Sequence, residues 1–331
     1  MLEGFGLLGN IIILIVALAA LDKASDVTIA HSVNVASVTG LGKTTVGFLL
    51  VAFSTSLPEL FVAVFSVLNP ENVGMSIGNV LGSNIVNICL ILGVCFLLIS
   101  LRYPEKSRVL PKMARAELGS LYFGLFIASI VPLALIYIGY ASRFIGVVLL
   151  AIFIYYMFQL SKVRTPAQQA TSGTKKNKLR KYVGLAILGA VGVIVSAYFI
   201  VESASYLALS VGIPRVVLGA TVVAFGTSVP ELSTSISAVK KGHVELALGN
   251  VVGSCFINIT LILGITLMAS SLIINMSAFS NVAIFSLITN LLLWYFLSNE
   301  RISRREGTVL LFLYAVFLVT SLGWIQIAQT T

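Results

Sequence analysis

The chain has 331 residues, of which 58% are hydrophobic and only 10% are charged. Soluble domains carry about 25% charged residues, so this composition excludes a soluble globular protein and indicates a membrane protein with several spans. A formal net charge of +9 would suit a nucleic-acid-binding protein, but here the basic residues follow the membrane topology instead.

Apolar stretches of about 20 residues, the length that crosses a bilayer, follow one another along the chain. The three cysteines, Cys89, Cys95 and Cys255, fall inside such stretches, so we expect them to pack as small apolar side chains and not to form disulfides or a metal site. The fold class expected is an all-α polytopic membrane protein. We expect ten transmembrane helices, near residues 4–22, 44–67, 73–100, 118–140, 143–161, 182–201, 214–239, 244–270, 278–298 and 307–327.

With ten spans, every Lys and Arg except Arg143 and Arg215 falls in alternate loops on one side of the membrane. Basic residues accumulate in cytoplasmic loops, so both chain termini are expected outside and the basic segment 162–181 in the cytoplasm. That segment has the Pro, Gly, Ser and Thr content of a flexible linker. We therefore expect a plasma-membrane protein that is surrounded by lipid and has no nucleic-acid partner.

Two pairs of motifs recur along the chain. "VGFLLVAFSTSLPEL" at 46–60 aligns without gaps to "LGATVVAFGTSVPEL" at 218–232. "GNVLGSNIVNICLILG" at 78–93 aligns in the same way to "GNVVGSCFINITLILG" at 249–264. Both copies of the second motif contain glycines spaced G-x-x-x-G, which let helices approach closely. We expect such packing at Gly78 and Gly82 and at Gly249 and Gly253.

The linker at 162–181 separates the two copies of these motifs. We expect residues 1–161 to form one repeat of five helices and residues 182–331 to form the second. Because five is odd, the second repeat enters the membrane from the opposite side. The result is an inverted repeat of the kind common in secondary transporters.

Each half places one carboxylate deep in an apolar window: Glu59 in the first half and Glu231 at the equivalent position of the second. A charge at the bilayer centre costs about 2.5–3.5 kcal/mol on insertion scales. No Lys or Arg lies deep in these windows to offset that cost, since Arg215 stands at the very end of its window. A protonated or merely tolerated Glu is the alternative, but the symmetric positions favour a functional site.

Oxygen donors accompany both glutamates on one helical face. In each half Thr, Ser and Glu stand at i, i+1 and i+4, and a Ser and an Asn lie four residues apart in the second motif. Pro58 and Pro230 cannot donate to the helical ladder, which frees carbonyl groups about one turn earlier, near Ser54 and Gly226. The candidate donors are Thr55, Ser56, Glu59, Ser83, Asn87 and the Ala52 carbonyl in the first half, and Thr227, Ser228, Glu231, Ser254, Asn258 and the Ala224 carbonyl in the second.

These donors are carboxylates, hydroxyls, amides and carbonyls, with no His or Cys among them. Such hard oxygen ligands favour Ca²⁺ or Na⁺ and disfavour Zn²⁺ or Cu²⁺. The formal charge of the two carboxylates can be balanced by one Ca²⁺, by Na⁺ ions or by protons. We expect these ions to be transported substrates, and we expect no bound cofactor and no enzymatic activity.

The motif pairs "STSLPE" with "GNVLGSNIVN" and "GTSVPE" with "GNVVGSCFIN" resemble the two alpha repeats of the sodium/calcium exchanger family, within the calcium/cation antiporter superfamily. The resemblance implies exchange of Ca²⁺ for Na⁺ by alternating access, with the first and sixth spans sliding across the other eight. It also implies central Ca²⁺ ligands at Glu59 and Glu231. The hydroxyl donors would complete Na⁺ and Ca²⁺ sites, and Asn87 and Asn258 would close the centre.

The chain departs from the family pattern at two positions. Ser54 replaces the usual Gly of the first motif, and Asn258 stands where many relatives carry Asp. Two carboxylates in place of three leave the number of exchanged Na⁺ ions open.

Two alternatives use the same oxygens. A proton/calcium antiporter of the same superfamily is one, because a buried carboxyl group can bind a proton as readily as a metal ion. Relatives of that kind typically resemble "GNxxE" where this chain has "TSLPE" and "TSVPE", which favours sodium coupling. A passive cation channel is the other alternative, and it would need no sodium on the opposite side.

Overall fold

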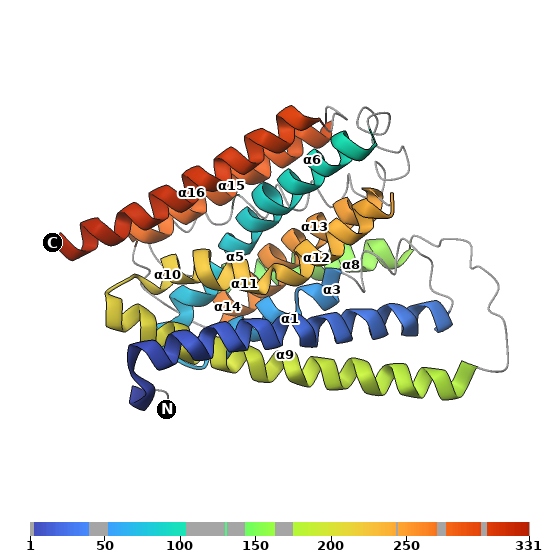
Figure 1. The fold of residues 1–331 in the computed structure, drawn as a ribbon, viewed down its shortest axis with the longest axis horizontal. Helices are drawn as coiled ribbons and strands as arrows, with labels where there is room; N and C mark the ends of the chain where they lie inside the picture. The colour runs from blue at the N-terminus through green and yellow to red at the C-terminus, as the bar shows by residue number, and fades with distance from the viewer. Residues whose placement is uncertain are drawn as a thin grey trace.

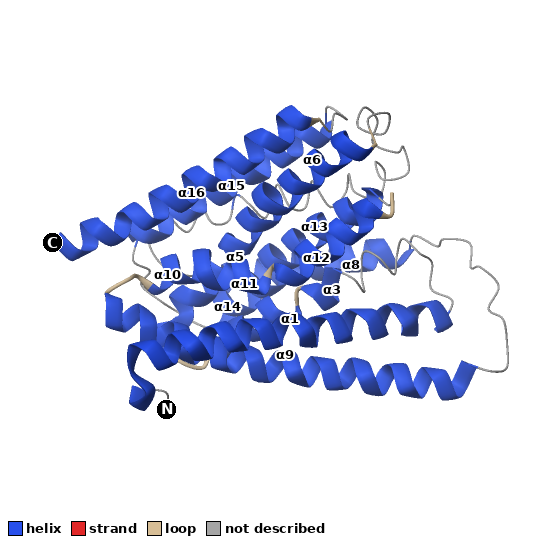
Figure 2. Cartoon of the chain, in the orientation of Figure 1, coloured by secondary structure: helices blue, strands red, loops and turns tan. Residues whose placement is uncertain are grey.

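The computed structural model describes residues 3–39, 52–103, 130, 143–162, 175–242, 244–269, 276–298 and 303–330. Every regular element in these ranges is a helix (Figure 2). The all-α class expected from the sequence therefore holds for the part of the chain that the structure describes.

In the first half, long apolar runs without internal Pro form continuous helices, and Pro and Asn mark their ends. The elements are η1 (Glu3–Phe5), α1 (Gly6–Thr39), α3 (Ala52–Thr55), α4 (Leu57–Val67), η3 (Pro70–Asn72), α5 (Val73–Ile85), η4 (Val86–Leu92), α6 (Gly93–Arg102) and α8 (Arg143–Lys162). The side chain of Asn69 caps η3 by accepting a hydrogen bond from the Glu71 amide, as Asn does at helix starts.

The described elements of the second half begin with a long helix. They are α9 (Lys175–Val211), α10 (Arg215–Leu218), η6 (Gly219–Val223), α11 (Ala224–Thr227), α12 (Val229–Lys240), α13 (Val244–Ile257), η7 (Asn258–Ile262), α14 (Leu263–Ala269), α15 (Met276–Ser298) and α16 (Arg304–Thr330). A glycine at φ 71°, Gly212, ends the turn after α9, where only a residue without a Cβ adopts this conformation freely.

Described helices lie over nine of the ten windows expected to span the membrane. The window at 118–140 falls outside the described residues, except for Ile130. Among the described residues, five helices are long and apolar enough to cross a membrane, or six if the bent pair 215–227 and 229–240 counts as one span. The count of ten spans and their inverted arrangement therefore remain predictions.

The first helices of the two halves, α1 and α9, are longer than their apolar windows at 4–22 and 182–201. They contain 34 and 37 residues, so both continue into polar sequence. Residues 175–181 of the expected flexible linker belong to α9, and Lys162 belongs to α8. The centre of the linker at 163–174 lies outside the described residues, so its expected bounds stay a prediction.

The helices form a body with α1 and α9 side by side along one edge (Figure 1). At the opposite edge α15 and α16 run together beside α6 (Figure 1). The short broken helices, α3 and α10 to α14, lie between these two edges together with α5. The motif-bearing segments of both halves thus occupy the middle of the molecule.

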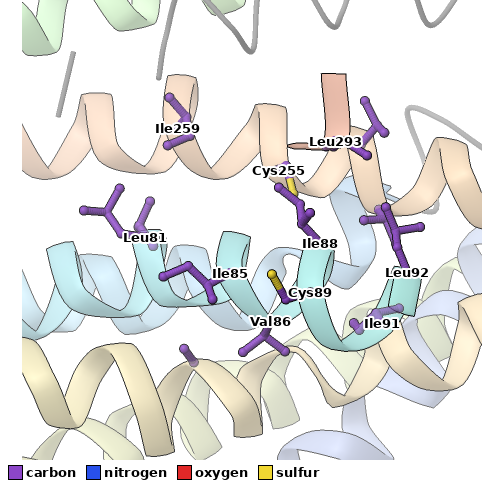
Figure 3. Close-up of a cluster of buried hydrophobic side chains, with 14 of the residues drawn as sticks. Leu81, Ile85, Val86, Ile88, Cys89, Ile91, Leu92, Cys255, Ile259 and Leu293 are labelled. Carbon is purple, nitrogen blue, oxygen red and sulfur yellow. The ribbon is translucent and has the colours of Figure 1, made fainter. Parts of the chain in front are cut away.

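Two apolar clusters hold this arrangement together. The larger joins the middle helices to α15 and α16 and contains Cys89, Cys95 and Cys255, all three free and buried. Figure 3 shows Cys89 and Cys255 among aliphatic side chains such as Ile88, which confirms that the cysteines pack as apolar residues. The smaller cluster lies between the α1–α9 pair and the middle of the molecule, where Leu21 is completely buried.

The outer faces of the long helices are apolar. Leu8 on α1, Phe144 on α8 and Phe312 on α16 are 73%, 74% and 69% exposed. Large apolar side chains at such exposure are unfavourable in water and favourable in lipid. The outer surface of the described helices therefore suits a bilayer.

The G-x-x-x-G glycines of the first half lie against the second half. A Cβ atom at Gly78 would overlap the carbonyl oxygen of Val216, and one at Gly82 would overlap the backbone of Ala220. The two backbones touch because neither glycine has a side chain. The predicted close approach is confirmed for α5, whereas the segment that would mirror it in the first half, around residue 48, lies outside the described residues.

Candidate functional site

Both motif-bearing helices break at a serine just before their glutamate. Ser56 has φ −83° and ψ 4° between α3 and α4, and Ser228 has φ −87° and ψ 4° between α11 and α12. The proline two residues later occupies the first turn of the next helix, where its missing N–H is tolerated. In the second half the two segments meet at 43°.

Each glutamate lies in the first turn after its break. Glu59 in α4 and Glu231 in α12 are completely buried. The first turn of a helix carries partial positive charge from its amide groups, which favours a carboxylate there. No Lys, Arg or His of the described residues pairs with either glutamate. The two carboxylates thus lack the basic partner that a structural role inside a membrane needs.

Hydroxyl groups surround one oxygen of each carboxylate. Oε1 of Glu59 accepts hydrogen bonds of 3.4 Å from Ser83 and from Ser228, which belongs to the other half. Oε1 of Glu231 accepts a bond of 3.3 Å from Ser254. The second oxygen, Oε2, of both glutamates is buried and has no hydrogen-bond partner among the described residues. One acceptor oxygen per carboxylate is therefore open to a cation.

The threonines join the two halves at the same place. Thr55 Oγ1 lies 3.3 Å from Ser254 Oγ, and Thr227 Oγ1 lies 3.4 Å from Ser83 Oγ. Each threonine thus lies beside the serine that contacts the glutamate of the opposite half. The helices bring together the Thr, Ser and Glu side chains that the sequence predicted, in two symmetric groups.

The two alanine carbonyls are buried beside these groups but are already hydrogen-bonded. The Ala52 oxygen accepts from the Ser56 amide at 3.0 Å and from the Thr55 hydroxyl at 3.1 Å. The Ala224 oxygen accepts from the Ser228 amide and the Thr227 hydroxyl at 3.1 and 3.3 Å. Either carbonyl can ligate a cation only after its threonine hydroxyl turns away.

The symmetry is incomplete at the serine that follows the threonine in each motif. Ser228 donates to Glu59 across the halves. Its counterpart Ser56 is equally buried, but its hydroxyl has no partner among the described residues. The sequence predicted the same role for both serines, so the structure distinguishes two positions that the motif does not.

The predicted asparagines are buried along the same two helical runs. Asn87 and Asn258 are completely buried. Asn258 Nδ2 donates to Asn84 Oδ1 at 3.1 Å, and Asn84 Nδ2 donates to the Cys255 carbonyl at 3.3 Å. Sequence reasoning missed Asn84, because its counterpart in the second repeat is Cys255 and the repeat gave no signal.

Two further asparagines at the site were missed as well. Thr55 Oγ1 lies 3.3 Å from Asn250 Oδ1, and Thr227 Oγ1 lies 3.1 Å from Asn79 Oδ1. Asn79 and Asn250 are equivalent residues of the "GN" motifs, four positions before Ser83 and Ser254. This i, i+4 spacing is the signal that could have placed them on the helical face of the predicted donors.

Irregular helical turns coincide with the site in both halves. The π-helical segment η4 contains Asn87, and the π-helical segment η7 begins at Asn258. Such wider turns leave backbone groups less regularly bonded and often occur at functional sites. The two halves therefore share a helix irregularity as well as side chains.

The helices and their outer faces are apolar, and the centre of the molecule holds two buried carboxylates surrounded by hydroxyl, amide and carbonyl oxygens. These features define an integral membrane protein whose centre suits cations. A search for family models matches the sodium/calcium exchanger protein family over residues 9–162 and 181–323. The chain belongs to this family, which is a family of transporters.

Curated relatives and solved structures agree with that assignment. The chain is 30% identical, over an alignment 349 positions long, to the sodium/calcium exchanger MaX1 of Methanosarcina acetivorans, and the alignment covers 94% of this chain and 97% of that one. It is 29% identical to the inner membrane protein YrbG of Escherichia coli over 76% of this chain and 78% of that protein. Structures of the sodium-calcium exchanger NCX_Mj superpose with a TM-score of 0.67 at 29% identity, covering 94% of this chain and 98% of the other. These comparisons show a cation/Ca²⁺ antiporter.

Proposed function

We propose that the chain is a secondary active antiporter that exchanges Ca²⁺ for Na⁺ by alternating access at the site between Glu59 and Glu231. One observation carries the proposal: both carboxylates are fully buried without a basic partner in the described residues, and each keeps one unpaired oxygen. Two negative charges in such surroundings need a cation. Ca²⁺ matches both charges at once.

The surrounding oxygens support Na⁺ as the counter-ion. Thr55 and Ser254 flank one carboxylate, and Thr227 and Ser83 flank the other. Neutral hydroxyl groups of this kind suit a monovalent cation next to a carboxylate. MaX1 and NCX_Mj are both named sodium/calcium exchangers, which supports the same pair of ions.

The arrangement of the helices supports movement of α1 and α9 relative to the other elements. The two helices pack on one another at one edge of the molecule (Figure 1) and share a separate apolar cluster with the middle of the molecule. We propose that the chain consists of two inverted repeats, 1–161 and 182–331, in a plasma membrane, with both termini outside and the 162–181 linker in the cytoplasm.

Ion fluxes in proteoliposomes test the coupling. Vesicles loaded with Na⁺ and diluted into Na⁺-free medium should take up radiolabelled Ca²⁺, and uptake should stop when the Na⁺ gradient is removed. An imposed pH gradient without Na⁺ should not drive uptake. Uptake that follows the pH gradient alone would establish a proton/calcium antiporter, and uptake that needs neither gradient would establish a channel.

A further inference from the structure

Two buried asparagines lie next to the threonines of the site. Asn250 on α13 lies within hydrogen-bond distance of Thr55, and Asn79 on α5 within that distance of Thr227. Each asparagine belongs to the opposite half from its threonine. In the part of the chain that the structure describes, neither asparagine forms a hydrogen bond to a glutamate carboxylate. Neither is therefore a direct candidate ligand of the central cation.

Each threonine hydroxyl has one proton and three acceptors within reach. For Thr55 these are the Ala52 carbonyl at 3.1 Å, Asn250 Oδ1 at 3.3 Å and Ser254 Oγ at 3.3 Å. If the proton points to Ala52, that carbonyl uses both lone pairs, because it also accepts the Ser56 amide. If the proton points to Asn250 or Ser254, one lone pair of the Ala52 carbonyl is open to a cation. The asparagine oxygen therefore helps to draw the proton away from the carbonyl that would be a ligand.

The side-chain amide nitrogens of the two asparagines have different surroundings. Asn250 Nδ2 donates to Ser235 Oγ at 3.1 Å and to the Glu231 carbonyl at 3.5 Å. Turning this amide over would set its oxygen against the Glu231 carbonyl oxygen, and two acceptors repel each other. The Asn250 oxygen is therefore fixed toward Thr55.

Asn79 has no such support. Its Nδ2 is buried and has no partner among the described residues. Glu59 and Glu231 are 172 positions apart, and with the same offset Ala63 occupies the place of Ser235. If the Asn79 amide turns over, its Nδ2 donates to Thr227 and the Thr227 proton goes to the Ala224 carbonyl at 3.3 Å, which is nearer than Ser83 Oγ at 3.4 Å. No hydrogen bond is lost, but the Ala224 carbonyl is closed to a cation.

We propose that Asn79 and Asn250 are positioning residues that open the Ala224 and Ala52 carbonyls to Na⁺, and that Ser235 makes the Thr55 side of the site bind Na⁺ more tightly than the Thr227 side. The inference rests on the proposed function. It adds a difference between the two halves that the symmetric motif does not predict.

The test measures the half-saturating Na⁺ and the half-saturating Ca²⁺ of Na⁺-driven Ca²⁺ uptake. Ser235→Ala removes the 3.1 Å bond and leaves the Asn250 amide with only the 3.5 Å contact to the Glu231 carbonyl, so the half-saturating Na⁺ should rise by up to roughly fivefold, the effect of losing one hydrogen bond. Ala63→Ser supplies the missing hydroxyl behind Asn79, so the half-saturating Na⁺ should fall. The half-saturating Ca²⁺ should stay within about twofold in both variants, because the carboxylates are unchanged.

Matched controls lie one turn further along the same helices. Ser66→Ala on α4 removes a buried hydroxyl that has no partner among the described residues. Ala238→Ser on α12 adds a hydroxyl at a buried position. Both control variants should leave the half-saturating Na⁺ unchanged, because among the described residues neither position is a hydrogen-bond partner of Asn79 or Asn250.

The outcomes separate the two proposals. If the parent protein shows no Na⁺-driven uptake, the proposed function fails. If the parent exchanges the ions but Ser235→Ala and Ala63→Ser keep the parental Na⁺ dependence, only the positioning role is overturned. Equal shifts of Na⁺ and Ca²⁺ dependence in Ser235→Ala would also overturn it, because they indicate general damage to the site.

Discussion

The two glutamates carry the charge of the site. Each is buried with one oxygen hydrogen-bonded to serine and the other unpaired in the described residues. Glu59→Gln or Glu231→Gln keeps the shape of the side chain but removes half of the formal charge. We expect Ca²⁺ uptake to fall by about a hundredfold or more in either variant, because an uncompensated ligand loss at a buried charge costs several kcal/mol.

The uptake of radiolabelled Ca²⁺ by equal amounts of reconstituted variant and parent measures this effect. Glu71→Gln is the control, because Glu71 is an exposed carboxylate paired with Arg215 at 3.0 Å, and exposed pairs contribute little. Near-parental exchange in Glu231→Gln would refute the assignment of the central site.

Asn258 tests the effect of a third carboxylate. In Asn258→Asp the side chain can no longer donate to Asn84 Oδ1, now 3.1 Å away, and a further negative charge enters a buried region. Like charges in such surroundings favour protonation of one of them. We expect uptake to become more dependent on pH than in the parent, with lower activity at acidic pH.

Asn258→Leu separates charge from hydrogen bonding, since it loses the bond to Asn84 without adding charge. Its pH profile should follow that of the parent. If the profile of Asn258→Asp also overlays the parental one, Asn258 lies too far from the carboxylates to affect them.

At the scale of helices, the contact between α5 and the second half depends on glycine. A methyl group at Gly82 would overlap the backbone of Ala220, which belongs to the π-helical segment η6 and cannot move without displacing α11 and Thr227. Gly82→Ala should therefore lower the free energy of unfolding by about 1–3 kcal/mol, as overpacking does. Gly184→Ala on α9 is the control, because nothing lies within 4 Å of its added Cβ.

Thermal melting of the purified protein in detergent measures both glycine variants. Gly82→Ala should melt at a lower temperature than the parent, and Gly184→Ala should not. A parental melting temperature for Gly82→Ala would show that the two backbones are not in contact in the protein.

A hydrogen bond links the α1–α9 pair to the middle of the molecule. Ser205 Oγ on α9 donates to Asn72 Oδ1 at the start of α5, at 2.7 Å. If α9 slides during transport, this bond breaks in one conformation. Ser205→Ala should therefore change the maximal uptake rate up to roughly fivefold while leaving the half-saturating Ca²⁺ unchanged.

The control for that variant is Ser210→Ala, because the Ser210 hydroxyl donates to the Tyr206 carbonyl of its own helix. Both rates come from initial uptake at saturating Ca²⁺. A Ser205→Ala protein with the parental rate would show that the bond does not distinguish the transport conformations.

Some elements could be predicted from the sequence and others could not, for physical reasons. The apolar windows located the helices, and the motif spacing placed the Thr, Ser and Glu of each motif on one helical face, because side-chain periodicity fixes such a face. The contacts of Glu59 with Ser83 and Ser228, which lie in other segments of the chain, depend on tertiary packing. The lengths of α1 and α9 were underestimated, because a helix continues beyond its apolar stretch. The support of Asn250 by Ser235 depends on tertiary packing, which one helix face does not reveal.

At the scale of the whole molecule, the two halves build one site from equivalent parts. In the exchange that we propose, two Na⁺ balance Glu59 and Glu231, and a further Na⁺ held by neutral hydroxyls is uncompensated. Exchange for one Ca²⁺ then moves net charge. We expect a membrane potential set with K⁺ and valinomycin to change the rate of Na⁺-driven Ca²⁺ uptake, and a rate independent of the potential would indicate electroneutral exchange.

The central claim is that Ca²⁺ and Na⁺ occupy the same site between the two carboxylates, in turn and not together. Calorimetric titration of the purified protein with Ca²⁺ tests this most directly. The account predicts one Ca²⁺ per chain, an apparent Kd that rises as Na⁺ is added, and loss of binding in the protein carrying both Glu59→Gln and Glu231→Gln. Ca²⁺ binding that is insensitive to saturating Na⁺, or that persists in the doubly substituted protein, would contradict it.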